Sequence, residues 1–580
     1  DDLNMNQKLE NILNVSLDAT EDELRKADSL STGYNWRDNT WEIIVKYSGS
    51  LESIRNRYNV YIKELLNYYA IIVADKATIE LISQEDVIDY VEKPKSLYYQ
   101  IERTKTAACV GSVRADGNIL SGKGVIVGVI DTGIDIFDNA FRNSDGTTRI
   151  LNIYDQTTGE KYDKQSIDEY IRLNEDLSGG TFSYDNAPGV DNIMHGTDVS
   201  YIAAGSLGVA YEADIIAVKM GYSINNQFPR TTSLMDAIDY IIRKAIEYRK
   251  PVAVNISYGC NYGAHNGNTL LESFIDDISK SYRCVICVGS GNEADKAIHF
   301  GGIINTGQVQ TAYLSVGEYQ SAIDIQIWKN YWDTIDVMLI NPRGEQIGII
   351  TEGRINRYET YNTEIITLLG EPSPYNIYQE IYINLIPKTD YILSGIWQIV
   401  LMAGSIRAGE YNIWLPSSQA LGYATAFNNP TADGTITIPA TARNCIAVGA
   451  YNAYTNSYAA FSGRGFDNSI RNVNAGVKPD ITAPGVDISI ARQRGNDITY
   501  RNVTGTSYAV PVVTGAAALL MQWGIVMGND RFMYGEKLKA ALIDGSKPVG
   551  LVGITRNDNQ PDPRTGWGAV CLKNTLNKIL

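Results

Sequence analysis

The sequence predicts an α/β protein built on a doubly wound, mostly parallel sheet. Between residues 101 and 300, short apolar strands such as "GVIVGVID", "PVAVNIS" and "RCVICVGSG" alternate with helical segments such as "TTSLMDAIDYIIRKAIEYR". The strands are apolar throughout, as expected where helices cover both faces of a parallel sheet. The same α/β pattern resumes after residue 430, so the sheet domain is interrupted by another unit and not simply followed by it.

Two further units differ from this domain in their sequence pattern. Residues 1–100 are charged and rich in Tyr, and strands alternate there with helical patterns, which indicates a small α+β module. Over residues 305–428 the helical pattern disappears, "AIDIQIW" alternates cleanly, and "VMLINPRGEQIGII" holds a turn between two strands. That stretch is typical of an inserted all-β domain of the sandwich or jelly-roll type. The sheet domain then comprises residues 101–304 and 429–580.

Charge and hydropathy exclude several classes of partner. The chain of 580 residues carries 50 Lys and Arg against 66 Asp and Glu, a net charge of −16, which argues against nucleic acid or an anionic membrane. No apolar run approaches the roughly 18 residues of a transmembrane helix, so we expect no membrane span. The start, "DDLNMNQKLENILN", is polar and acidic and shows no secretory signal, which by itself favours the cytoplasm.

The cysteines do not form a convincing metal site. Cys284 and Cys287 make a CxxC pair, but "CVICVGSG" has the pattern of a buried strand, on which residues three apart point to opposite faces. No second Cys pair lies nearby, and the whole chain has 3 His. We therefore expect reduced, structural cysteines, no metal ion at this pair and no cofactor.

The segment "NVTGTSYAVPVVTG" places Ser507 at the start of a predicted buried helix. Small residues keep this helix thin, and Pro511 is tolerated best near a helix start, where its missing N–H needs no partner. Unpaired N–H groups and the positive end of the helix dipole then lie beside Ser507, a suitable place for a nucleophile whose attack creates an oxyanion. The alternative is an ordinary Ser or Thr helix cap.

Three other residues have the types that such a nucleophile needs. Asp131 ends the apolar strand "GVIVGVI", His195 stands in "MHGTDVSYIAAG" at a helix start, and Asn292 follows an apolar strand in "VGSGNEAD". Each has an ordinary structural interpretation: "DTG" as a turn, a lone histidine as a core residue, and a loop asparagine as a turn residue. Together they supply the carboxylate, the imidazole and the amide donor of an acyl-transfer site.

Six blocks, in order along the chain, resemble the subtilisin-like serine proteases. They are "VIDTGID", "HGTDVSYIAAG", "VNISYG", "GSGNE", "KPDITAPG" and "GTSYAVPVVTG", and they span about residues 101–300 and 430–580. The resemblance implies that Asp131 orients His195, that His195 is the general base and then the general acid, and that Ser507 is the nucleophile. It also implies that Asn292 and the Ser507 backbone N–H form the oxyanion hole.

The resemblance extends to substrate binding and to the first 100 residues. It implies that Ser257, Tyr258 and Gly259 form a strand edge that pairs with the substrate backbone, and that residues 1–100 are a prodomain that also inhibits. The tail "EKPKSLYYQ" has the extended character of a strand that pairs with this edge. We therefore predict that the chain cuts itself between Gln100 and Ile101 and that the prodomain stays bound non-covalently. The alternative is that "SLYYQIERTK" is only a linker between the two units.

The insertion, with "HFGG" at residues 299–302 and "IQIWKNYWD", resembles the Csp-type germination proteases of clostridia. In that group the insertion is a jelly-roll domain, and active members cut the proenzyme of a cortex-lytic hydrolase in the spore. This resemblance implies a protein substrate of that kind and a location in the spore. Some members are pseudoproteases, so a silent protein that binds a partner or germination signal is the alternative. A broad-specificity secreted subtilase is a further hypothesis, disfavoured by the missing signal.

Overall fold

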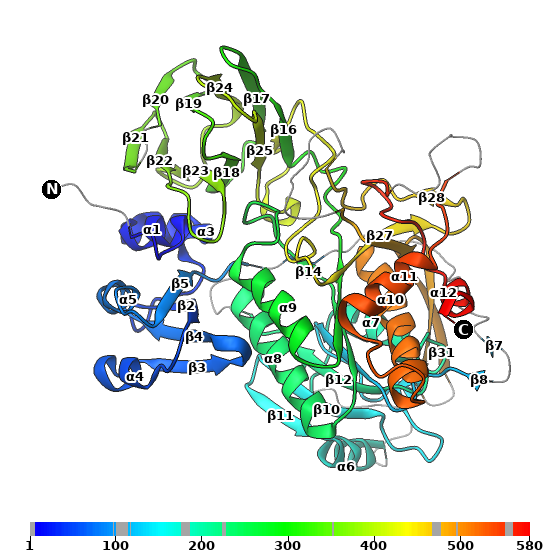
Figure 1. The fold of residues 1–580 in the computed structure, drawn as a ribbon. Helices are drawn as coiled ribbons and strands as arrows, with labels where there is room; N and C mark the ends of the chain where they lie inside the picture. Colours follow the sequence, from blue (N-terminus) through cyan, green and yellow to red (C-terminus); the bar gives the residue numbers. More distant parts are fainter. Residues whose placement is uncertain are drawn as a thin grey trace.

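The computed structural model describes residues 6–96, 98–99, 114–115, 118–175, 186–222, 228–350, 353–466, 477–494, 497–550 and 561–579. They form three units (Figure 1). The N-terminal module, up to residue 99, lies beside a central sheet domain, and an all-β insertion lies above both. Along the chain, the strands of the insertion lie between β15 and β27 of the central sheet.

The central domain is built on a mostly parallel sheet. Its strands β10, β12, β9, β13, β15, β27 and β29 run parallel, and β11 and β28 pair antiparallel at its edges. The predicted sheet is confirmed. In spatial order the strands are β11 (Glu160–Asp163), β10 (Ile150–Asp155), β12 (Asp214–Lys219), β9 (Ile126–Asp131), β13 (Val252–Ile256), β15 (Cys284–Gly289), β27 (Ile446–Asn452) and β28 (Ser457–Tyr458), with β29 (Ile481–Pro484) also on β27.

Helices cover both faces of this sheet, which explains why its strands are apolar throughout. On β9, Val127 and Val129 join a core with α7 (His195–Ala204) and α10 (Thr506–Met521), while Ile126 and Ile130 join a second core with α8 (Thr231–Tyr248) and α9 (Leu270–Ser281). The domain also contains β7 (Arg114–Ala115), β8 (Asn118–Ile119), β14 (Tyr258–Gly259), β30 (Ile488–Arg494), β31 (Asp497–Val503), α6 (Lys164–Glu175), α11 (Gly535–Asp544), α12 (Leu572–Ile579) and the 3₁₀ turn η2 (Asn139–Phe141).

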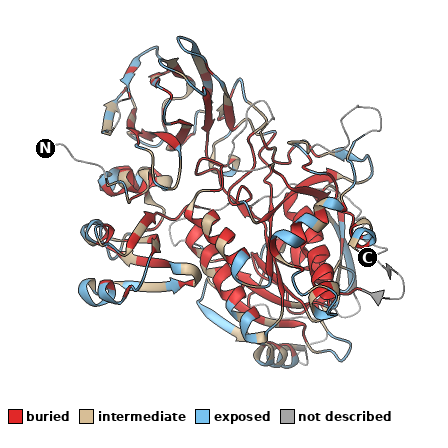
Figure 2. Ribbon diagram, in the orientation of Figure 1, coloured by how far each residue is buried: buried red, intermediate tan, exposed pale blue. Residues whose placement is uncertain are grey.

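Helix α10 runs through the centre of the domain, and all its residues are buried (Figure 2). With the π-helical turn η4 (Gln522–Val526), it is the one helix among the described residues that is long and apolar enough to cross a membrane. Because 83% of that stretch is buried inside the protein, it has the character of a core helix. Pro511 lies in the second turn of α10, further from the helix start than the sequence led us to expect.

The N-terminal module is α+β, as predicted. Its antiparallel sheet packs one face on α8 and α9 through residues such as Ile44 and Ile71, and the alternate residues Ile43 and Ile72 face its own helices. The strands are β1 (Tyr34–Asn35), β2 (Thr40–Tyr47), β3 (Tyr61–Leu65), β4 (Tyr69–Ala74) and β5 (Ile88–Glu92), and the helices are α1 (Asn11–Asp18), α2 (Glu21–Lys26), α3 (Asp28–Ser31), α4 (Glu52–Tyr58), α5 (Lys76–Ser83) and the 3₁₀ turn η1 (Leu66–Tyr68).

The insertion consists of two antiparallel sheets that share a hydrophobic core. One sheet has the order β16 (His299–Ile303), β25 (Glu410–Trp414), β18 (Ile323–Asn330), β23 (Tyr378–Pro387), β22 (Thr363–Leu369) and β21 (Ile355–Glu359). The other has the order β20 (Gln346–Ile349), β19 (Ile335–Ile340), β24 (Gly395–Ala403), β17 (Val309–Val316) and β26 (Ala426–Phe427). The first strand, β16, lies before residue 305.

The insertion and the N-terminal module share a second hydrophobic core. On β22, Ile365 points into the insertion, whereas Ile366 and Leu368 pack with residues of α1–α3. Tyr382 on the neighbouring strand β23 joins the same shared core. Since alternate residues of a strand face opposite sides, one face of this sheet is covered by its own partner sheet and the other by the N-terminal module.

Ion pairs and a hydrogen bond join the rims of this shared core. Arg357 contacts Asp18 at 2.8 Å and Glu23 at 3.1 Å, and Asn11 donates to Glu380 at 3.0 Å. The N-terminal module is therefore bound to the insertion as well as to the sheet domain.

We expect Ile366→Ala to loosen the N-terminal module specifically. Removing this fully buried side chain should cost about 2–5 kcal/mol at the shared core. Hydrogen exchange of the amides in residues 11–31 should become faster, because local opening reports the local stability. The matched variant Ile365→Ala should speed exchange in the insertion strands instead. Equal protection of residues 11–31 in both variants would contradict this assignment.

Candidate active site

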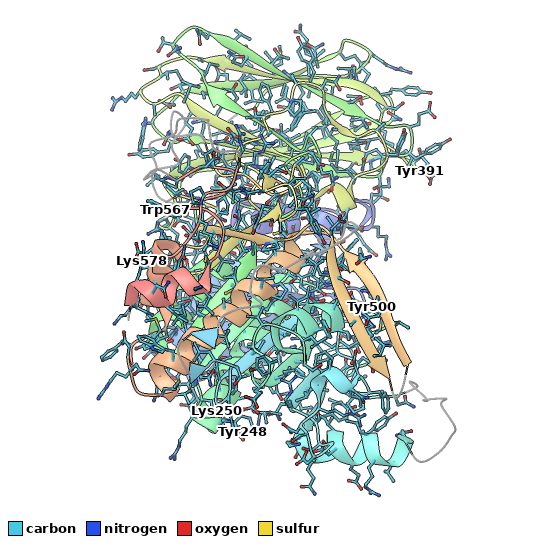
Figure 3. The ribbon with its side chains drawn as sticks, turned by 90° about the vertical axis from the view of Figure 1, so that its right-hand side faces the viewer. Tyr248, Lys250, Tyr391, Tyr500, Trp567 and Lys578 are labelled. Atoms are coloured by element: carbon cyan, nitrogen blue, oxygen red, sulfur yellow. The ribbon has the colours of Figure 1, made fainter. Side chains whose placement is uncertain are left out.

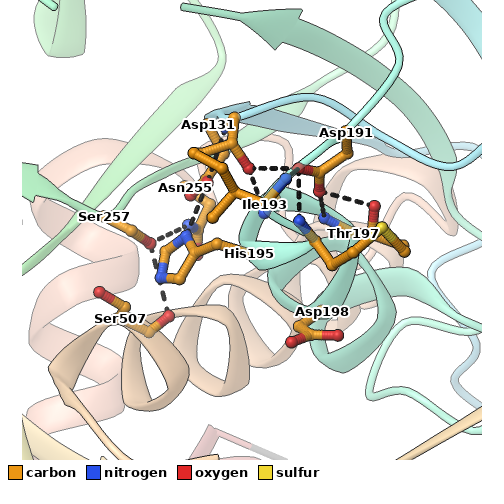
Figure 4. Close-up of polar contacts among 12 residues, drawn as sticks. Asp131, Asp191, Ile193, His195, Thr197, Asp198, Asn255, Ser257 and Ser507 are labelled. Carbon is orange, nitrogen blue, oxygen red and sulfur yellow. Dashed lines mark hydrogen bonds and ion pairs between the residues drawn. The ribbon is translucent and has the colours of Figure 1, made fainter. Parts of the chain in front are cut away.

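The structure brings Asp131 and His195 into direct contact. Asp131 is the last residue of β9, and His195 is the first residue of α7. His195 Nδ1 lies 2.6 Å from Asp131 Oδ1, and both side chains are almost fully buried. Because a carboxylate only accepts, the hydrogen bond places the proton on Nδ1. Figure 4 shows the imidazole between Asp131 and Ser507.

Glycines allow α7 to approach the loop that follows Asp131. A Cβ on Gly196 would lie 2.3 Å from the Gly133 carbonyl oxygen and 2.9 Å from Asp131 Cβ. Gly133, at φ +132°, would in turn meet the Gly189 carbonyl oxygen at 2.4 Å. Any side chain larger than that of glycine at these positions would separate His195 from Asp131. This explains why glycine follows "DT" at position 133 and His195 at position 196.

Asp191 is a site residue that the sequence reasoning missed. Its Oδ1 accepts from Thr132 Oγ1 at 2.7 Å, and its Oδ2 accepts from the N–H and hydroxyl of Thr197 at 2.8 and 2.7 Å. Thr132 also donates its N–H to Asp131 Oδ1 at 2.8 Å and accepts from the Gly196 N–H at 2.9 Å. Asp191 thus ties the Asp131 loop to the first turn of α7. The sequence signal was an acid four residues before the histidine.

Ser507 is the second residue of α10, as predicted, and is fully buried. The residue before the helix, Gly505, has φ +148°, a conformation that L side chains rarely adopt. A Cβ on the nearby Gly485 would lie 2.9 Å from the Gly505 carbonyl oxygen, so two glycines let this turn pack tightly. Ser507 therefore lies at the positive end of the helix dipole.

The second-turn proline explains the role of Ser257. A proline at position 511 cannot donate to the Ser507 carbonyl four residues earlier. The Ser257 hydroxyl lies 3.4 Å from that carbonyl oxygen and donates to it, and it accepts from Asn255 Nδ2 at 3.0 Å. Since this hydroxyl is already bonded to α10, a substrate would contact the backbone of Ser257 and not its side chain.

Asn292 lies beside the residue that precedes Ser507. Its Oδ1 accepts from the Thr506 N–H at 3.0 Å and from the Thr506 hydroxyl at 3.2 Å. This orientation places Nδ2 on the opposite side of the amide, where it is buried and has no acceptor within hydrogen-bond distance among the described residues. A buried amide with two unused N–H groups is a ready donor for an incoming oxygen.

The predicted pairing of the N-terminal tail with the strand edge is observed. Strand β6 (Tyr98–Tyr99) pairs antiparallel with β14, with Tyr99 opposite Tyr258 and Tyr98 opposite Gly259. The tail thus occupies the edge that the sequence assigned to substrate. The predicted cleavage positions Gln100 and Ile101 lie outside the described residues.

The CxxC pair has the geometry that the strand pattern predicted. Cys284 packs in the core under α8 and α9, and Cys287 packs in the core under α7 and α10, so the two thiols lie on opposite faces of the sheet. Burial raises the pKa of each to about 12, which disfavours the thiolate that a metal ion needs. Among the described residues, no group of three His, Cys, Asp or Glu side chains is arranged to hold a metal ion.

Comparisons with known proteins agree with this geometry. Residues 122–372 and 408–568 match the Subtilase family, and residues 7–95 match the Csp protease B prodomain. The subtilase-type proteinase RRT12 of Saccharomyces cerevisiae is 33% identical over 128 residues, which are 22% of this chain and 23% of that protein. Subtilisin-like protease 10 of Arthroderma otae is 34% identical over 120 residues, 21% of this chain and 27% of that protein.

A solved structure resembles the chain over a larger part of its length. The CspB protease of Clostridium perfringens has a TM-score of 0.73 and 34% identity, and the match covers 81% of this chain and 96% of that one. The family match covers more than half of the chain, with Asp131, His195 and Ser507 inside it. The chain therefore belongs to the subtilase family of serine proteases, as its ordered sequence blocks predicted, and its N-terminal module is a prodomain of the Csp protease B type.

Proposed function

We propose that the chain is a serine endopeptidase that cuts a protein substrate through an acyl-enzyme. The observation that carries this proposal is the buried Asp131–His195 contact beside Ser507 at the start of α10. Ser507 Oγ attacks the peptide carbonyl carbon while its proton passes to His195 Nε2, and Asp131 keeps the Nδ1 proton in place. The imidazolium then protonates the leaving amine. A water molecule that gives its proton to the same nitrogen hydrolyses the acyl-enzyme.

The developing oxyanion is stabilised by two donors. Asn292 Nδ2 is one, because its amide is oriented by Thr506 and offers its N–H groups in a buried site. The Ser507 backbone N–H, in the first turn of α10, is the other. Both donors are in place before the substrate binds, so the transition state gains their interaction without reorganisation.

Substrates bind as an additional strand on Ser257, Tyr258 and Gly259. The support is the pairing of β6 with β14, in which the prodomain tail occupies this edge. The next residues of the tail are Gln100 and Ile101, and we propose that the chain cuts itself between them. The cut prodomain stays bound, because its sheet shares one core with α8 and α9 and its helices share another with the insertion.

The physiological reaction that we propose is the limited activation of a cortex-lytic proenzyme in the germinating spore. The prodomain match and the similarity to a clostridial CspB protease support this setting. We assign residues 1–100 to the prodomain, 101–304 and 429–580 to the subtilase domain, and 305–428 to a jelly-roll domain. Two antiparallel sheets around one core suit that last assignment.

A fluorophosphonate probe tests the proposed chemistry directly. The probe reacts with a serine that a neighbouring base activates, so the wild-type chain should be labelled and Ser507→Ala should not. The unfolding temperature of both proteins provides the control for folding. A folded wild-type chain that is neither labelled nor cut at its own N-terminal tail, which lies on the substrate edge, would instead favour the alternative function, a pseudoprotease that binds a partner or germination signal.

Self-cleavage should be visible on denaturing gels. The wild-type chain is expected to run as two pieces, one of them residues 1–100, which co-elute on a native column. Ser507→Ala, matched in every other respect, should remain a single chain. N-terminal sequencing of the larger piece should begin at Ile101. A wild-type chain that stays whole, or a new N-terminus far from residue 101, would exclude this cleavage.

The oxyanion donor is tested by two substitutions at position 292. Asn292→Ala should raise the activation free energy by about 2.7–4 kcal/mol, the range found for the corresponding donor of subtilisin, mainly through kcat. Asn292→Asp keeps an oxygen that can accept from Thr506 but loses the N–H donor. It should therefore be at least as slow, while its unfolding temperature stays closer to wild type. Unchanged kcat on a peptide in either variant would remove Asn292 from the site.

A further inference from the structure

The hairpin that precedes the nucleophile also contacts the helix that carries the histidine. Strands β30 and β31 form a two-stranded antiparallel sheet, in which Arg501 lies opposite Ile490 and Arg492 opposite Thr499. Directly opposite residues share a face, so both arginines project on the side where Ile490 enters the hydrophobic core. On the other face Tyr500, which marks the hairpin in Figure 3, is 73% exposed.

Both arginines bind the first turn of α7. Asp198, three residues after His195, is fully buried and forms ion pairs with Arg492 through Oδ1 and with Arg501 through Oδ2. The same guanidinium groups donate to the Met194 carbonyl oxygen, at 3.1 Å from Arg492 and 3.2 Å from Arg501. Each arginine thus spans from the residue before His195 to the residue three positions after it.

The backbone around His195 needs such support. Met194 has φ +68°, a left-handed backbone conformation that is unfavourable for residues other than glycine. Its carbonyl oxygen accepts the Asp198 N–H at 3.2 Å in addition to the two arginines, so three donors fix the peptide plane next to the imidazole. A carboxylate as buried as Asp198 is strongly unfavourable without cationic partners, which makes the arginines necessary to the arrangement.

The connection to the nucleophile is short. Strand β31 ends at Val503, and α10 begins at Thr506, immediately before Ser507. The Asp487 N–H donates to Thr504 Oγ1 at 2.8 Å and the Gly505 N–H donates to the Gly485 carbonyl at 2.8 Å, so the start of β30 is also bonded to this junction. A shift of the hairpin relative to α7 would therefore change the distance between His195 and Ser507.

We propose that Arg492 and Arg501, bound to Asp198 and to the Met194 carbonyl, are positioning residues that set His195 relative to Ser507. This inference rests on the proposed function. We call the four groups the arginine clamp. The clamp acts by holding the imidazole at the geometry that proton transfer needs, and an error of about 1 Å there can slow a reaction about a hundredfold.

Arg501 offers the sharper test, because its side chain is 41% exposed and its replacement leaves the core intact. The assay substrate is a chromogenic peptide with the tail sequence Ser-Leu-Tyr-Tyr-Gln. Arg501→Gln should lower kcat about ten- to a hundredfold, with KM changed less than about twofold. Its unfolding temperature should fall, because only Arg492 then pairs with Asp198, so kcat is measured below the unfolding transition of each variant. Arg501→Lys keeps the charge but loses the planar guanidinium that donates to both Asp198 and the Met194 carbonyl. Its kcat should therefore lie between those of the wild type and Arg501→Gln.

A control on the same strand separates positioning from general damage to the hairpin. Tyr500→Ser, on the outer face, should keep the wild-type kcat. The double variant Asp198→Asn with Arg501→Gln should lose less than the sum of the two single losses, because both changes break the same Arg501–Asp198 pair. Wild-type kcat in Arg501→Gln, additive losses in the double variant, or a loss that only follows the fraction of folded protein would each overturn the clamp.

A spectroscopic measurement makes the result independent of turnover. The strongly hydrogen-bonded proton on His195 Nδ1 should give a proton NMR signal far downfield, which Asp131→Asn assigns by removing it. Arg501→Gln should shift or broaden this signal and Tyr500→Ser should not; an unchanged signal in Arg501→Gln would overturn the clamp. A wild-type chain that neither reacts with fluorophosphonate, nor cuts the peptide, nor cuts itself would refute the proposed function, and the NMR comparison would still decide the clamp.

Discussion

The burial of one carboxylate, Asp131, constrains most of the site. It ends the central strand of the sheet and is 1% exposed, so its charge requires donors inside the protein. Those donors are the Thr132 N–H and His195 Nδ1, and both demand that α7 reach the strand end closely. Gly196 permits that approach, because any Cβ there would overlap the loop after the strand.

The residues around Ser507 are held from both sides. Asn292 accepts the N–H of Thr506, just before Ser507, and Ser257 donates to the carbonyl that Pro511 leaves without a helical partner. These two contacts come from the loops that follow neighbouring parallel strands, β15 and β13. The loops at the carboxyl ends of β13 and β15 and the start of α10 are therefore one hydrogen-bonded unit.

The prodomain is a structural partner of two other units. Its sheet buries one face against α8 and α9, while its helices share a core with the outer face of the insertion. Its tail then reaches the strand edge of the cleft. A module held at three places separates slowly, because separation requires all three contacts to open together. The insertion therefore extends the surface that retains the prodomain.

The sequence by itself determined the sheet domain, the α+β module, the all-β insertion, and the places of Asp131, His195 and Ser507 at element ends. Period-two and continuous apolar patterns carry that information locally. Asp191 and the Arg492–Asp198–Arg501 contacts left no such pattern, because their partners are distant along the chain or depend on side-chain direction. The position of Pro511 in the second turn of α10 could not be predicted either, because the Ser257 hydroxyl, from another part of the chain, replaces the missing N–H as donor to the Ser507 carbonyl. Only the tertiary structure decided these features. Each is a side-chain contact between two separate elements, and the sequence of either element alone does not show which element it will contact.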